Sequence, residues 1–298
     1  MASAIAPATA VIFRRSRIDI GRLHPSTSAT VVKWITIVRL WRYAENGSSG
    51  VESSRSRCDR CGVTSDIGQA LDWVEQGQRR LEEAVAALRE EAVGEPSALP
   101  GWTRGHVITH VARNADALVN LLTWARTGTP TPMYARPEQR NADIEAGAGR
   151  ALAEQLADLR ESGRRFADVA TSMSPQAWQA TVRNAQGAEM PASRVPWFRV
   201  REVWIHLVDL GAGAGIDVIP DDVALELLRD VAGWMSPKLD QAVSLRPDGH
   251  PPVTVGPDAE ARATVAGPAN LMAGWLVGRG DLGALRCEGT VPTLPRWL

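Results

Sequence analysis

The stretch TRGHVITHVARNADALVNLL, residues 103–122, has the pattern of an amphipathic helix with a defined start. Thr103 is of a type that caps helix N-termini, because its hydroxyl can accept a hydrogen bond from an unpaired backbone N–H of the first turn. Apolar side chains then recur at mostly helical spacing, at Val107, Val111, Leu118, Leu121 and Leu122. The sequence Gly-Thr-Pro at residues 128–130 predicts the end of this helix.

Three further stretches carry a similar apolar periodicity on either side of this helix. They are residues 66–91, where Asp66 can cap the start, residues 139–171 and residues 197–210. Four amphipathic helices joined by connections of varied length are typical of a helix bundle. We therefore expect a bundle over residues 63–213.

The sequence after residue 213 mixes helical and strand patterns. Helices are expected at residues 221–235 and 268–277, and short β-branched runs at 253–255 and 263–265 indicate strands. Such a mixture predicts a smaller α+β domain over residues 214–298. The predicted fold class is α+β overall, with a four-helix bundle followed by this smaller domain.

The composition favours a globular protein that acts on small molecules. The chain has 298 residues, 44% of them hydrophobic, and its 33 basic and 34 acidic residues leave a net charge of −1. This balance gives no general attraction to nucleic acid or to a membrane surface, and the apolar stretches fall short of the roughly 20 residues of a membrane span. Three cysteines suit a reducing compartment. We expect a cytoplasmic monomer with no nucleic-acid or membrane partner.

Residues 1–62 are rich in arginine and fit neither expected domain. They could be a targeting segment, a disordered basic arm, or upstream sequence translated from a wrongly assigned start. The third interpretation is favoured, because a plausible domain begins at Val63 and valine codons can serve as bacterial starts.

Two pairs of polar residues have the spacing of neighbours on a helix face. His106 and His110 are four residues apart on the second expected helix, and Glu202 and His206 on the fourth. Each pair alone is also typical of ordinary hydrogen bonding. On facing helices of a bundle, however, one histidine and the Glu/His pair would form a His₂Glu site with an open fourth position, as in catalytic zinc centres. The spacing does not choose between His106 and His110.

Several stretches resemble the mycothiol-dependent maleylpyruvate isomerase family, a branch of the DinB-like metal-binding bundles. The similarity extends over residues 64–298 and leaves 1–62 unmatched. The stretches that carry it are LPGWTRGHVITHVARNAD at 99–116, TPTPMY at 129–134, QRNADIEAG at 139–147, REVWIHLVDL at 201–210, and the tail at 278–279 and 294–297.

The resemblance implies a metal site and two small-molecule reactants. The ligands that it implies are His110, Glu202 and His206, with His106 in a supporting or packing position. The cofactors are zinc, or another divalent ion, and mycothiol, an actinobacterial thiol. The implied reaction is the cis–trans isomerisation of maleylpyruvate to fumarylpyruvate in gentisate-type aromatic catabolism. A thiolate would add to the double bond, rotation would follow, and the thiol would then be expelled.

The enolate formed by addition and the carboxylates of the substrate need positive partners. Arg279 is the candidate catalytic residue, and Arg140 and Tyr134 are candidates for binding the substrate or thiol. Asn114, one turn beyond His110, could orient a ligand. Two alternatives remain open: a mycothiol S-transferase of the same fold that acts on other electrophiles, and a non-catalytic metal-binding protein.

Overall fold

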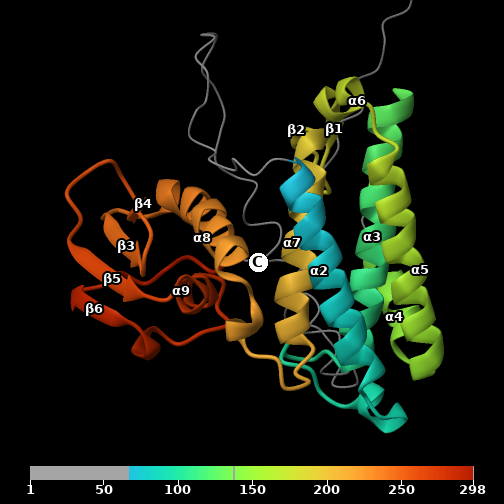
Figure 1. Ribbon diagram of the computed structural model, residues 1–298, viewed down its shortest axis with the longest axis horizontal. Helices are drawn as coiled ribbons and strands as arrows, with labels where there is room; N and C mark the ends of the chain where they lie inside the picture. Colours follow the sequence, from blue (N-terminus) through green and yellow to red (C-terminus); the bar gives the residue numbers. More distant parts are fainter. Residues whose placement is uncertain (1–66, 137, 298) are drawn as a thin grey trace, which may run out of the picture. The chain divides into compact units, whose positions relative to one another are not determined.

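The computed structural model describes residues 67–136 and 138–297. Its long helices in the first part form the bundle, in which α2 packs along α7 and α3 along α5 (Figure 1). Their bounds are α2 (Ile67–Ala86), α3 (Arg104–Thr127), α5 (Leu152–Thr171) and α7 (Val195–Asp209). Asp66 and the expectations for residues 1–62 lie outside the described residues.

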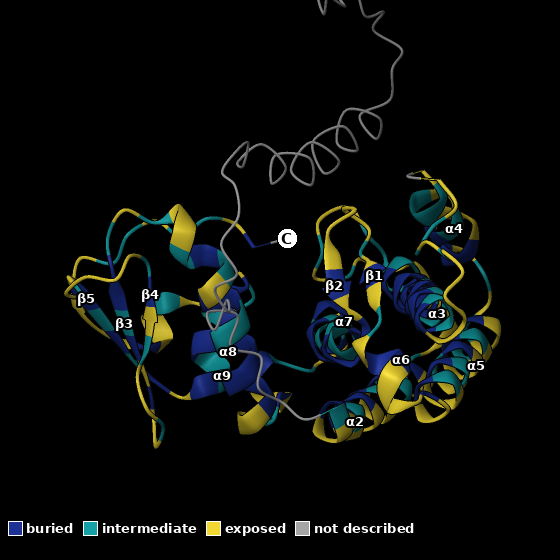
Figure 2. Ribbon diagram, turned by 90° about the horizontal axis from the view of Figure 1, so that it is seen from above, coloured by how far each residue is buried: buried dark blue, intermediate teal, exposed yellow. Residues whose placement is uncertain are grey.

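Helix α3 lies at the centre of the bundle and is largely enclosed (Figure 2). Its predicted bounds are confirmed: the Thr103 side chain accepts a hydrogen bond from the backbone N–H of His106, and Gly128 ends the helix in the left-handed conformation at φ 74°. The apolar side chains Val107, Val111, Leu118, Leu121 and Leu122 are each fully buried. Their burial is the main force that holds the other helices around α3.

The expectation of one helix over residues 139–171 is wrong. The chain forms α4 (Gln139–Ala148), breaks, and resumes as α5 at Leu152. Gly149 is the C-cap of α4. Helix α4 packs closely on α3, because a Cβ at Gly105 would lie 2.1 Å from the carbonyl oxygen of Ala148 and one at Gly147 would lie 2.5 Å from the Thr109 side chain. Glycine at both positions permits this close approach.

Short elements connect the bundle helices. They are η2 (Glu90–Gly94), α6 (Pro175–Gln179), η3 (Ala192–Arg194) and the antiparallel strands β1 (Thr181–Arg183) and β2 (Glu189–Pro191). Ser174 caps α6 through a hydrogen bond from the backbone N–H of Ala177. Neither α6 nor the β1–β2 hairpin was predicted from the sequence.

The C-terminal part contains a mixed sheet with helices packed on it (Figure 2). The strand order is β4-β3-β5-β6, in which β3 and β5 run parallel and the outer pairs are antiparallel. Its elements are η4 (Ile216–Val218), α8 (Asp221–Met235), η5 (Ser236–Lys238), β3 (Val243–Pro247), β4 (Val253–Val255), β5 (Ala263–Gly267), α9 (Ala269–Leu276), η6 (Leu282–Ala284) and β6 (Arg286–Gly289). The α+β class is thereby confirmed, whereas β3 and β6 were not predicted.

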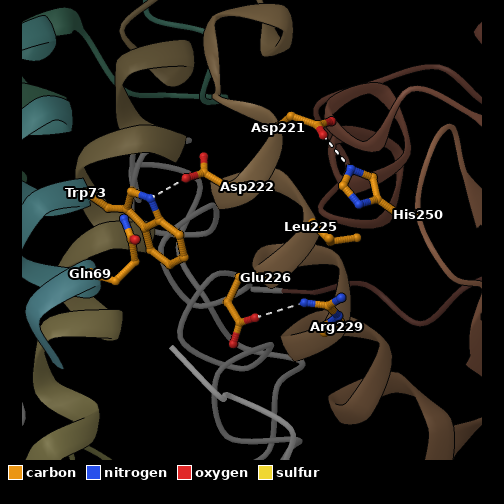
Figure 3. Close-up of a pocket in the computed structure, with 8 residues that line it drawn as sticks. All are labelled: Gln69, Trp73, Asp221, Asp222, Leu225, Glu226, Arg229 and His250. Atoms are coloured by element: carbon orange, nitrogen blue, oxygen red, sulfur yellow. Dashed lines mark hydrogen bonds and ion pairs between the residues drawn. The ribbon is translucent and has the colours of Figure 1, made fainter. Parts of the chain in front are cut away.

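Polar side chains join the bundle to the C-terminal part. Trp73 of α2 donates its indole N–H to Asp222 of α8 across 2.8 Å, beside a cavity of about 460 Å³ (Figure 3). Arg279, which follows α9, binds Asp209 at the end of α7. The domain boundary at residue 213 stays a prediction. Among the described helices, none has both the length and the apolar character needed to cross a bilayer.

Candidate metal centre

Helix α7 presents three polar side chains on one face. Glu202, His206 and Asp209 follow one another at spacings of four and three residues, which places them on successive turns of the same side. The neighbouring residues Val203, Ile205 and Leu207 are buried among the other helices. The apolar residues therefore fix the rotation of α7, and this rotation directs the polar face toward α3.

The structure brings His110 of α3 to this face and leaves His106 further away. The Oε2 atom of Glu202 lies 3.0 Å from Nε2 of His110 and 3.3 Å from Nε2 of His206. The two Nε2 atoms are 3.1 Å apart. Within the described residues, these three side chains are the one group with the donor set and spacing to hold a metal ion.

The spacing and donor types fit a divalent ion. Bonds of about 2.0–2.2 Å in tetrahedral geometry put neighbouring ligand atoms about 3.3–3.6 Å apart, a few tenths of an ångström more than the separations of 3.0–3.3 Å found here. Both ring nitrogens lie within 3.3 Å of one carboxylate oxygen, so the three donor atoms converge on one point. A His₂Glu set suits zinc and several other divalent ions.

The charges of the metal-free site are set by burial and by hydrogen bonds. Burial, followed by the nearby charge of Arg140, lowers the pKa of His110 to about 4, so its ring is neutral and keeps a lone pair. Burial would also lower the pKa of His206, but hydrogen bonds to Asp209 and Glu202 raise it to about 9. Burial would raise the pKa of Glu202, yet the two histidines hold it well below its ordinary value. The carboxylate is thus ionised and available as a ligand.

Asp209 connects His206 to Arg279. Its Oδ2 lies 2.9 Å from Nδ1 of His206, and its two oxygens each accept a hydrogen bond of 3.0 Å from the Arg279 guanidinium. Gly278, at φ 74°, turns the chain after α9 so that Arg279 faces back toward α7. The third guanidinium nitrogen donates to the carbonyl of Val277. In this structure Arg279 therefore acts on the site through Asp209, and its direct action on substrate stays a prediction.

Arg140, Tyr134 and Trp102 lie beside the candidate ligands. Nη2 of Arg140 is 3.4 Å from Nδ1 of His110, and its guanidinium also interacts with the Tyr134 hydroxyl. Burial is the main cause that raises the pKa of Tyr134 to about 12, so this phenol stays protonated. The Trp102 ring is edge-on to the His110 ring at 5.6 Å. These three residues therefore surround one side of His110.

His106 and Asn114 have other partners. His106 is the third residue of α3, where its Nδ1 accepts a hydrogen bond from the backbone N–H of Thr103 and completes the helix cap. Asn114 is buried and accepts a hydrogen bond of 3.1 Å from Arg199. The direct contact of Asn114 with a ligand stays a prediction.

Sequence reasoning did not single out two residues near the site. Asp209 could have been found, since it lies three residues after His206 and so on the same helix face. Arg199 is fully buried on α7 and binds the Val111 carbonyl, Asn114 and Gln78. Burial lowers its pKa to about 10. An arginine amid apolar residues gives no sequence signal for such a position.

The fold is a helix bundle followed by an α+β part, with one His₂Glu cluster between α3 and α7 within the described residues. The family described as mycothiol maleylpyruvate isomerase N-terminal domain matches residues 74–211. Two crystal structures of the mycothiol-dependent maleylpyruvate isomerase, one of them a histidine-to-alanine mutant, are each 33% identical to the chain with a TM-score of 0.71. The similarity covers 78% of this chain and 98% of each of theirs. The chain belongs to the mycothiol-dependent maleylpyruvate isomerase family, which is a family of enzymes.

A further solved structure is more distant. YfiT from Bacillus subtilis, described as a probable metal-dependent hydrolase with an unusual four-helix bundle topology, is 16% identical with a TM-score of 0.42, over 55% of this chain and 91% of that one. A search of curated proteins found no match.

Proposed function

We propose that the chain catalyses the mycothiol-dependent isomerisation of maleylpyruvate to fumarylpyruvate, with zinc or another divalent ion held by His110, Glu202 and His206. The observation that carries the proposal is the convergence of these three donors in a member of this family. We also propose that the substrate comes from gentisate-type ring cleavage in the cytoplasm, and that the enzyme acts as a monomer.

The reaction requires that rotation about a carbon–carbon double bond become possible. Addition of a thiol sulfur to one carbon gives a single bond that can rotate, and expulsion of the same thiol restores the double bond in the trans form. A divalent ion in the site would lower the pKa of the thiol and so supply the thiolate near neutral pH.

The residues of the chain would hold the reactants in a positive environment. Asp209 fixes the ring of His206 through Nδ1, which leaves Nε2 directed at the centre. The charge of Arg140 next to His110 favours an anionic substrate. Trp102 covers the same region and limits the access of water, which strengthens both electrostatic contacts.

The test is the loss of maleylpyruvate absorbance with purified, zinc-loaded protein, with and without mycothiol. We expect turnover that needs mycothiol and is lost in His110→Ala. His250→Ala is the matched control, because His250 pairs with Asp221 in the C-terminal part and should keep full activity. Folded, metal-loaded protein without turnover would overturn the proposal. Consumption of mycothiol with other electrophiles would then favour the S-transferase, and its absence a non-catalytic metal-binding protein.

A further inference from the structure

In each of the two candidate ligand histidines, Nε2 points to the centre and Nδ1 points away from it. The two histidines differ in the group that faces Nδ1. Nδ1 of His206 faces a carboxylate, since Oδ2 of Asp209 lies 2.9 Å away. Nδ1 of His110 faces a guanidinium, since Nη2 of Arg140 lies 3.4 Å away. A carboxylate only accepts hydrogen bonds, whereas a guanidinium only donates them.

This difference matters because both histidines would bind a metal through Nε2. A neutral imidazole bound in this way carries its proton on Nδ1, and that N–H is normally satisfied by a carboxylate, a carbonyl or water. Asp209 meets this need for His206. Arg140 cannot meet it for His110, because two donors would then face each other.

In the arrangement found here, His110 has the opposite tautomer. Nδ1 accepts from Arg140, and the proton on Nε2 points to the centre, where Oε2 of Glu202 lies 3.0 Å away and Nε2 of His206 lies 3.1 Å away. Metal binding at Nε2 moves this proton to Nδ1 and removes the acceptor of Arg140. Both groups then need a new partner that accepts hydrogen bonds.

The other contacts of Arg140 provide no such anion. Nη1 donates to the side chain of Asn141 at 3.1 Å, Tyr134 interacts with the guanidinium, and the ring of Trp102 lies 6.0 Å from it. None of these partners carries a negative charge, so the cation faces the centre without a counter-ion among them.

We infer that a substrate carboxylate occupies the position between Nδ1 of His110 and the guanidinium of Arg140, with one or both of its oxygens accepting from the two groups. The Trp102 ring lies 5.6 Å from the His110 ring and 6.0 Å from the guanidinium of Arg140, so it borders this position on one side. The inference rests on the proposed function for the identity of the substrate, which is a dicarboxylate. The inference has a further consequence. Metal binding at Nε2 places the proton of His110 on Nδ1, and a carboxylate beside Nδ1 accepts a hydrogen bond from that proton. Each therefore favours the tautomer that the other needs, so metal and carboxylate bind cooperatively.

Calorimetry with zinc and maleate, without mycothiol, measures this cooperativity. In the unsubstituted protein, zinc should tighten maleate binding, and maleate should tighten zinc binding by the same factor. Charge-assisted hydrogen bonds of this kind correspond to about 10- to 100-fold in affinity. Arg140→Gln should lose most of that factor while still binding zinc. Arg136→Gln is the matched control, because Arg136 is exposed and pairs with Gln139.

Nitrogen NMR of the histidines gives a second readout. In the zinc-loaded protein, maleate should slow exchange of the Nδ1 proton of His110, and this effect should be missing in Arg140→Gln. If the cooperativity survives in Arg140→Gln, maleate binds the metal without this position and the inference is overturned. If the enzyme turns over but zinc and maleate bind independently, the inference is overturned and the proposed function stands. If zinc and maleate bind cooperatively but there is no turnover, only the proposed isomerase activity is overturned.

Discussion

Replacement of Asp209 with asparagine tests whether the carboxylate between His206 and Arg279 holds the candidate metal centre together. Asp209 is 1% exposed, and its side-chain partners among the described residues, His206 and Arg279, are both donors. The amide keeps the size of the side chain but removes the charge. Arg279 then loses its counter-ion, and the ring of His206 loses a fixed acceptor at Nδ1.

The magnitude follows from the pKa of Asp209 in the metal-free protein. Burial would raise this pKa, but hydrogen bonds from His206 and Arg279 lower it from 3.8 to about 2. Since one unit of pKa is worth about 1.36 kcal/mol, the ionised carboxylate stabilises the fold by about 2 kcal/mol at pH 7. A depressed pKa gives stability that is complete above about pH 4 and is lost as the pH falls toward 2. About half of this stabilisation by the Asp209 carboxylate should remain at pH 3.

The assay is urea unfolding of metal-free protein at pH 7, 4 and 3, together with zinc titration at pH 7. Asp209→Asn should lower the free energy of unfolding by about 2–3 kcal/mol at pH 7, with a smaller deficit at pH 3. Zinc affinity should fall about 10- to 100-fold, as for other residues that orient a metal-bound histidine. Asp240→Asn is the control, because Asp240 is exposed and should change stability by less than about 0.5 kcal/mol. A pH-independent deficit, or a loss at pH 7 no larger than that of the control, would refute the reasoning.

Three further substitutions probe the site and the packing that supports it. Glu202→Gln should abolish stoichiometric zinc binding, measured by dialysis and metal analysis, because only two of the three donors remain strong ligands. Arg199→Met should lower the urea-derived free energy of unfolding by about 1–3 kcal/mol, because it leaves buried acceptors without a donor; an unchanged value would contradict this. Gly105→Ala should cost about 1–3 kcal/mol or more in the same assay, because the new Cβ would meet the carbonyl of Ala148. Full stability of Gly105→Ala would show that α4 can move away from α3 at little cost.

The sequence predicts an element well where local chemistry marks its ends. Thr103 and Gly128 delimit α3, and residues 221–235 form α8 as expected. The prediction fails where tertiary packing decides. The break at residues 149–151 lies where α4 packs closely on α3, a contact that helical periodicity does not reveal. Strand β6 has four exposed residues and so lacks the alternation of buried and exposed positions by which a strand is recognised.

The same distinction applies to the candidate site. Helical spacing alone places His106 and His110 on one face and Glu202 and His206 on another, but it cannot say which histidine meets the pair. The structure adds a physical reason. His106 occupies the third position of α3, where its ring completes the cap with Thr103, whereas His110, one turn further along, faces α7. The sequence contains a capping pattern, in which Thr103 is followed three residues later by His106, whose side chain can accept a hydrogen bond. This pattern assigns His106 to the helix cap and so favours His110 as the candidate ligand.

The contact between Arg279 and Asp209 connects the C-terminal part to the candidate metal centre of the bundle. Asp209 is ionised partly because Arg279 donates two hydrogen bonds to it, and the ionised carboxylate in turn holds the proton of His206 at Nδ1. No comparable contact from the protein holds a proton at Nδ1 of His110 among the described residues, since Arg140 faces that atom. The fold itself therefore orients the candidate ligand His206, whereas we propose that the orientation of His110 depends on what binds beside it. A site built in this way would bind metal weakly when empty and more tightly when an anionic substrate is present.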